Sequence, residues 1–117
     1  MITLQGNAVT ITNPDFTKSF DESNDNWERR PECNLLFLKT MQNRMNDVLR
    51  ARGHVFLNDV YDALGFQRTS TGALVGWLVD DKHEGYIDFQ MQNRQQENPP
   101  SVALTFNVDG IIYDKID

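Results

Sequence analysis

One segment of the chain, residues 31–52, carries the clearest periodic pattern and constrains the fold most strongly. After Pro31 the apolar residues recur three and four positions apart, and polar residues occupy the positions between them. Apolar residues at this spacing fall on one side of an α-helix. Gly53 then provides the left-handed conformation that ends many helices, and Arg50 and Arg52 suit the negative end of the helix dipole. The pattern predicts a helix over residues 31–52 that packs on a sheet through Leu38, Met41, Met45 and Val48.

A second, shorter helix is predicted next, over Val55 to Leu64, with Gly65 as its end. Beyond Gly72 the pattern changes to apolar or alternating runs that are separated by polar or glycine-containing turns, which is typical of β-strands. Asp109-Gly110 has the composition of a tight hairpin turn. The predicted strands cover residues 73–79, 86–91, 102–108 and 111–116.

The N-terminal residues and two polar segments complete the expected organisation. Residues 1–12 alternate around Gly6-Asn7, which predicts a β-hairpin. Residues 13–31 are acidic and hold few apolar residues, so we expect an irregular packed segment. Residues 92–101 are polar with two prolines and predict an exposed loop. Because strands cluster after the helices, the fold class is α+β, with an N-terminal β-hairpin, two helices (one long, one short) and a mainly antiparallel C-terminal sheet.

Composition limits the partners and the compartment. The 117 residues fit a single domain, residues 1–117, and the net charge of −6 opposes contact with phosphate backbones, so a nucleic-acid partner is not expected. A single cysteine, Cys33, excludes an intramolecular disulfide and fits a reducing compartment. No apolar run approaches the ~20 residues of a membrane-spanning helix, and the residues after Met1 do not resemble a secretion signal. We expect a cytoplasmic protein without a membrane partner.

The residues that could carry chemistry do not form a recognisable catalytic or metal-binding motif. His54 and His83 lie far apart, and neither has ligand-type residues at a spacing that would build a metal site on one element. We therefore predict no metal, no cofactor and no enzymatic activity. A cryptic enzyme that uses Asp88, His54 or Tyr86 stays open as a less favoured hypothesis.

The turn from Arg68 to Gly72 offers a different kind of site. Arg68, Thr69, Ser70 and Thr71 could grip a nucleotide or another anion through one guanidinium and several hydroxyl or amide donors. The simpler interpretation is that these hydroxyl groups satisfy the backbone of their own turn. Binding of a small anionic ligand is thus the alternative function.

Charge and apolar patterning favour contacts with protein. Residues 29–52 hold six basic and two acidic residues in a chain that is acidic as a whole. This polarity favours contacts of Arg44, Arg50 and Arg52 with the acidic segment or with another subunit, and a helix that exposes its polar face to water is an equally good interpretation. The strands 73–79 and 86–91 offer more apolar residues than two short helices can cover, so we expect Trp77 and Phe89 to meet a partner or a second copy, most simply in a homodimer.

Five segments resemble small uncharacterised proteins encoded by bacteriophages, prophages and mobile elements of Gram-positive bacteria. They are E-C-N-L-L-F-L at 32–38, A-R-G-H-V-F-L-N-D-V-Y-D-A-L-G at 51–65, L-V-G-W at 74–77, G-Y-I-D-F at 85–89 and F-N-V-D-G-I-I at 106–112. The resemblance implies a phage or prophage setting, in a bacterial host cell or in association with a virion, and a structural, regulatory or counter-defence role. The leading hypothesis is a non-enzymatic protein that acts through protein contacts, as an assembly part or as an inhibitor of a host factor.

Overall fold

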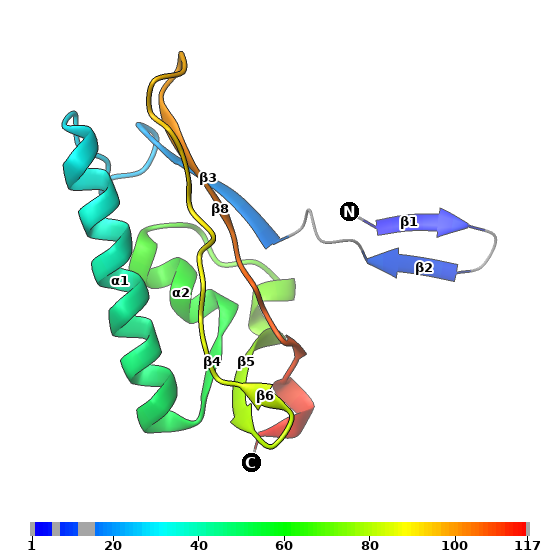
Figure 1. The fold of residues 1–117 in the computed structure, drawn as a ribbon. Helices are drawn as coiled ribbons and strands as arrows, with labels where there is room; N and C mark the ends of the chain where they lie inside the picture. The colour runs from blue at the N-terminus through cyan, green and yellow to red at the C-terminus, as the bar shows by residue number, and fades with distance from the viewer. Residues whose placement is uncertain (1, 6–7, 12–15, 117) are drawn as a thin grey trace.

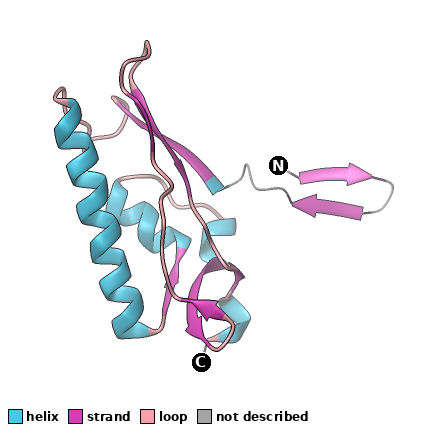
Figure 2. Cartoon of the chain, in the orientation of Figure 1, coloured by secondary structure: helices cyan, strands magenta, loops and turns pink. Residues whose placement is uncertain are grey.

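The computed structural model describes residues 2–5, 8–11 and 16–116, and it shows an α+β fold with two helices and antiparallel sheets (Figures 1 and 2). The helices are α1 (Pro31–Arg52) and α2 (Leu57–Leu64). The strands are β1 (Ile2–Gln5), β2 (Ala8–Ile11), β3 (Thr17–Asp21), β4 (His54–Phe56), β5 (Val75–Asp80), β6 (His83–Glu84), β7 (Gln92–Arg94), β8 (Ser101–Thr105) and β9 (Gly110–Ile111). The described residues also include the 3-10 turns η2 (Thr71–Ala73) and η3 (Tyr113–Lys115).

The two helices end where the sequence predicts. Gly53 and Gly65 both adopt positive φ angles, 87° and 90°, and each donates its backbone N–H to the carbonyl four residues earlier. This is the left-handed cap that a residue with a Cβ adopts only with strain. The short helix begins at Leu57 rather than Val55, because residues 54–56 pair with β5 as strand β4.

The strands form three separate antiparallel groups. β1 pairs with β2 across the predicted N-terminal turn, whose Gly6 and Asn7 lie outside the described residues. β8 lies between β3 and β7, and β5 lies between β4 and the short partners β6 and β9. The mainly antiparallel C-terminal sheet is therefore present, divided between two groups of strands.

Several predicted elements need correction. Residues 13–31 are not irregular throughout, because 17–21 form strand β3 against β8, and the predicted loop 92–101 includes the exposed strand β7. The Asp109-Gly110 pair is not a hairpin turn, since β9 pairs with β5 and the chain then enters η3 instead of a strand over 111–116. Residues 86–91, predicted as a strand, join no ladder of their own, and Gln90 within them has a positive φ of 46°.

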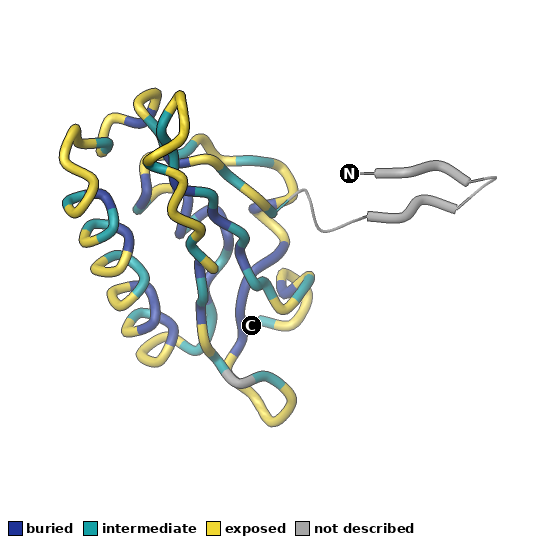
Figure 3. The backbone as a smooth tube through the Cα atoms, turned by 45° about the horizontal axis from the view of Figure 1, so that its top comes forward, coloured by how far each residue is buried: buried dark blue, intermediate teal, exposed yellow. Residues whose placement is uncertain are grey.

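The core is one cluster of buried apolar side chains that draws on both helices and both C-terminal groups of strands. Figure 3 shows that α1 turns one side to this core and the other to solvent. Asn46, on the buried side of α1, accepts a hydrogen bond from the Ile87 N–H (2.7 Å) and donates one to the Ile87 carbonyl (2.9 Å). Its amide group thus pairs with residue 87 as a neighbouring strand would, which fastens the 86–91 segment to the helix.

Among the described residues, no helix combines the length and the apolar character needed to cross a lipid bilayer.

Candidate functional site

Trp77 and Phe89 do not form the surface that the sequence suggested. Both side chains are 0% exposed. The Trp77 indole N–H donates to Asn107 Oδ1 at 2.9 Å, and the Phe89 ring packs edge-to-face on Phe106 with ring centres 5.5 Å apart. Both aromatic residues belong to the hydrophobic core of a single chain. A partner cannot reach them without unfolding it.

The three arginines predicted to bind a partner differ in their contacts. Arg50 forms an exposed ion pair with Asp47 on its own helix. Arg52 bonds to Asp59 of α2 at 2.8 Å, and Arg44 forms no ion pair with any residue that the structure describes. Two of the three, Arg44 and Arg52, line one hollow.

This hollow lies between the two helices, and we call it the α1–α2 groove. It has a volume of about 360 Å³. The α1 residues that line it are spaced three and four apart, so they form one stripe along the helix. The lining residues are Met41, Arg44, Met45, Val48 and Arg52 of α1 with Asp59 and Ala63 of α2.

The groove has an apolar floor and a charged rim. Met45 is buried, and Met41, Val48 and Ala63 are half-buried, so apolar atoms are reachable from solvent along the floor. Ala63 contributes only a methyl group to the lining, so a longer side chain at this position would occupy part of the hollow. Methionine side chains are flexible and adapt to differently shaped apolar groups.

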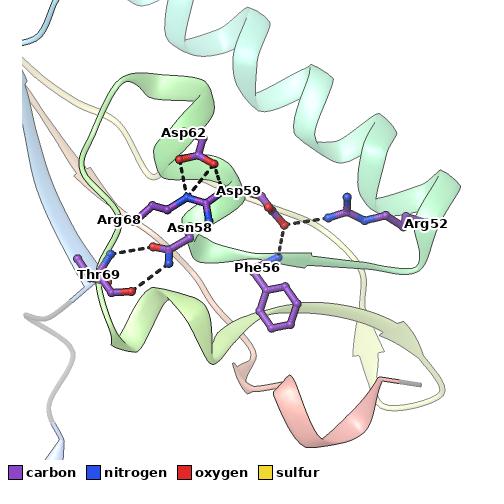
Figure 4. Close-up of polar contacts among 7 residues, drawn as sticks. All are labelled: Arg52, Phe56, Asn58, Asp59, Asp62, Arg68 and Thr69. Atoms are coloured by element: carbon purple, nitrogen blue, oxygen red, sulfur yellow. Dashed lines mark hydrogen bonds and ion pairs between the residues drawn. The ribbon is translucent and has the colours of Figure 1, made fainter.

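The contacts of Asp59 hold one end of the groove in place. Its Oδ2 atom accepts hydrogen bonds from the Arg52 guanidinium (2.8 Å) and from the Phe56 backbone N–H (3.0 Å), as Figure 4 shows. The second bond satisfies a donor at the start of α2, where a helix has no internal partner. Since Asp59 neutralises Arg52, the charge left at the rim is the positive charge of Arg44.

The turn at residues 68–72 is engaged by its own chain. Arg68 binds the Asp62 carboxylate through two nitrogens, with Nε at 3.0 and 3.1 Å from its two oxygens (Figure 4). The Asn58 side chain bonds to both the N–H (2.9 Å) and the carbonyl (3.0 Å) of Thr69. The Thr69 hydroxyl accepts from the Gly72 N–H at 2.8 Å.

These contacts leave little for an anion to bind. The Arg68 hydrogen bond lowers the pKa of Asp62 below its usual value, so at neutral pH a carboxylate stands where an anion would approach Arg68. Ser70 and Thr71 are exposed, but the guanidinium and the Thr69 amide are already paired. The geometry therefore does not favour the alternative function, and the local interpretation of the turn accounts for its contacts.

Each of the residues considered for a cryptic enzyme makes a contact with another residue of the chain. The His54 ring packs edge-to-face on Phe56, with ring centres 5.8 Å apart. Gln42 donates to the Tyr86 hydroxyl at 3.3 Å, and Asp88 accepts the Gln90 N–H at 2.8 Å. Within the described residues there is no group of three or more His, Cys, Asp or Glu side chains placed to hold a metal ion.

The sequence singled out Arg44, Arg50 and Arg52 as contact residues, of which Arg44 and Arg52 line the groove, and it assigned the floor of the groove to the core. Met41, Met45 and Val48 have the spacing of buried residues, and Met45 is buried. The signal for a groove was the position of Arg44 and Arg52 within the same helical stripe, which places cations beside apolar residues. The contribution of Ala63 depends on how α2 crosses α1, and no local pattern encodes that crossing.

Comparison with known proteins gives a family and no function. The model of one protein family, described as a family of unknown function (DUF6353), matches residues 3–116. No curated protein and no solved structure matches the chain.

Proposed function

The chain belongs to the DUF6353 family of unknown function, and we propose that it is a non-enzymatic protein that acts by binding another protein in the α1–α2 groove. The observation that carries this proposal is the combination of a methionine-lined floor with an arginine, Arg44, that has no ion-pair partner among the described residues. Methionine and arginine are enriched at protein interfaces, and a groove between helices is a common receptor for an amphipathic segment.

The groove also defines the chemistry of the segment that it binds. Apolar side chains of the partner would displace water from Met41, Val48 and Ala63, and burial of this surface would provide most of the binding energy. A carboxylate of the partner would pair with Arg44. The Arg52–Asp59 ion pair, whose two charges compensate each other, would offer no net attraction to a second carboxylate at its end of the groove. The expected partner segment is thus apolar with an acidic residue at the Arg44 end.

We propose separately that the protein belongs to a phage or prophage, because its sequence resembles small proteins of that origin. In that setting the protein would act in the cytoplasm of a bacterial host or with a virion, as an assembly part or as an inhibitor of a host factor. A groove that accepts one amphipathic segment is compatible with either role. Co-purification from infected or prophage-carrying cells would decide between them.

The groove is tested with peptides selected from a random library against the immobilised protein. We expect the selected sequences to combine apolar residues with Asp or Glu. Arg44→Glu replaces an attraction by a repulsion and should weaken binding by about tenfold or more, which corresponds to ~1.4 kcal/mol. Ala63→Leu should block the groove by filling it. Fluorescence anisotropy with labelled peptides measures both effects.

Matched variants on the exposed side of α1 serve as controls. Arg50→Glu makes the same charge change outside the groove, and Ala51→Leu makes the same size change at an exposed position. Both should bind the peptides as the unchanged protein does. If the selected peptides bind all four variants equally, or if no peptide is selected, the groove is not a protein-binding site.

A further inference from the structure

The backbone groups along the α1–α2 groove limit the form in which a partner segment can bind there. On α1 the groove runs from Met41 to Arg52, which is about 16 Å at a rise of 1.5 Å per residue. Backbone groups inside a helix bond to one another, and the Gly53 N–H bonds to the Leu49 carbonyl at 2.7 Å. Over the described residues 41–49, this wall of the groove therefore offers side chains and no unpaired backbone group.

Strand β4 has an edge that a partner strand could use, and two lining residues of the groove cover it. The hydrogen bonds between β4 and β5 turn the backbone groups of His54 and Phe56 away from β5. Arg52 Nε donates to the His54 carbonyl (3.1 Å), and Asp59 Oδ2 accepts the Phe56 N–H (3.0 Å). Proteins commonly cover strand edges against further pairing. The Arg52–Asp59 pair thus occupies backbone groups that an added strand would need.

These contacts favour a partner that satisfies its own backbone. An extended segment in the groove would lose water from its N–H and C=O groups and would find no backbone partner along residues 41–49. A helix bonds these groups internally. It also presents apolar side chains three and four positions apart, which matches the spacing of the α1 stripe. A helix of about 11 residues, or about three turns, spans the groove.

The charges of the groove favour one direction for such a helix. A helix carries a positive partial charge at its N-terminus and a negative one at its C-terminus. Arg44, which has no ion-pair partner among the described residues, lies about two turns before Arg52 on α1. The C-terminus of α1, with its own negative partial charge, lies at the Arg52 end. A bound helix with its C-terminus at the Arg44 end therefore meets an opposite charge at both ends.

We propose that the partner segment binds in the α1–α2 groove as an amphipathic α-helix of about three turns that runs antiparallel to α1. Its acidic residue lies in its C-terminal half, because that half faces Arg44. This inference rests on the proposed function, since it specifies the segment that the groove binds. It predicts that α1, α2 and the partner pack as three helices.

NMR of the bound peptide tests the helical form. Peptides selected against the full chain are labelled with ¹³C, and their Cα shifts in the complex should be helical over about three turns. One central, solvent-facing position is then set to alanine, to α-aminoisobutyric acid, which favours helix, or to proline, which breaks it. We expect α-aminoisobutyric acid to keep or improve the affinity and proline to weaken it by about tenfold or more. Extended Cα shifts, or proline that binds as well as alanine, would overturn the helical form.

Spin labels at the two ends of the peptide test its direction. Met41 and Val48 lie about 10 Å apart along α1, so a label near one end of the groove affects their methyl signals unequally. A C-terminal nitroxide should broaden the Met41 signal more than the Val48 signals, and an N-terminal nitroxide should do the opposite. The reverse pattern would overturn the antiparallel direction.

The outcomes separate this inference from the proposed function. Peptides that bind in the groove in an extended form, or parallel to α1, would leave the proposed function standing and refute the inference. If no peptide is selected, both are refuted. Helical shifts together with broadening of Met41 by the C-terminal label would support both.

Discussion

Replacement of Asn46 by alanine should destabilise the protein far more than the loss of an ordinary polar residue. The Asn46 side chain is 4% exposed and makes three hydrogen bonds, to the Ile87 N–H, the Ile87 carbonyl and the Gln42 carbonyl. Asn46→Ala leaves the N–H and the carbonyl of the buried residue Ile87 without these partners. Each buried backbone group left unsatisfied costs about 1–3 kcal/mol, so we expect a loss of ~2–5 kcal/mol.

Urea unfolding followed by tryptophan fluorescence measures this loss. Asn43→Ala, at an exposed position of the same helix, is the matched control and should change the free energy of unfolding by less than about 0.5 kcal/mol. Asn46→Asp keeps an acceptor for the Ile87 N–H but loses the donor to its carbonyl, so it should also destabilise. If Asn46→Ala lowers the free energy of unfolding by no more than Asn43→Ala does, the amide pairing does not hold the 86–91 segment on α1.

Other predictions concern the core and the pH dependence of stability. Leu38→Ala, at a fully buried position of α1, should cost ~2–5 kcal/mol in urea unfolding, and an unchanged midpoint would contradict the assigned core. Phe89→Arg should unfold the chain rather than only dissociate a dimer, because the side chain is fully buried. A circular dichroism spectrum like that of the unchanged, folded protein would contradict this. Backbone and side-chain hydrogen bonds from Lys82 and His83 lower the pKa of Asp80, and those from Ser23 lower the pKa of Asp21. A lowered pKa in the folded state gives stability that is present above the unfolded pKa and lost as the pH falls through the folded pKa. Urea midpoints should therefore fall below about pH 4, and less so in Asp80→Asn; an identical acid dependence in that variant would count against the Asp80 contacts.

Local signals explain the elements that the sequence predicted well. The ends of α1 and α2 depend on Gly53 and Gly65, whose conformational freedom acts within one turn of each helix. The N-terminal pairing follows from the alternation of eight neighbouring residues. In each case, the interactions that determine the element lie close together in the chain.

Long-range pairing explains the elements that were predicted wrongly. Strand β3 has one buried apolar residue, Phe20, and it becomes a strand by pairing with β8, at least 80 positions away. Ile111 and Ile112 look like the start of a strand, but β9 pairs with β5 and the chain then turns into η3. Such pairings depend on the whole fold and leave little trace in a local pattern.

The same distinction applies to the candidate site. Arg44 and Arg52 were named together with Arg50 from the excess of basic residues over 29–52, and that excess does not show which of the three line a groove. The burial of Trp77 and Phe89 could not be predicted, because alternation shows that a strand has an apolar face and does not show what covers it. Here α1 covers the 86–91 segment through Asn46 and Gln42, whose side chains bond to the backbone of Ile87 and Phe89.

Binding of a partner in the α1–α2 groove is tested most directly by the methyl signals of the methionines. The chain has four methionines, Met1, Met41, Met45 and Met91, so ¹³C-methyl labelling gives a spectrum with few signals. Titration with a selected peptide should shift the signals of Met41 and Met45, which line the groove, and leave those of Met1 and Met91 in place. A peptide that binds with measurable affinity while the Met41 and Met45 signals do not move would contradict the claim.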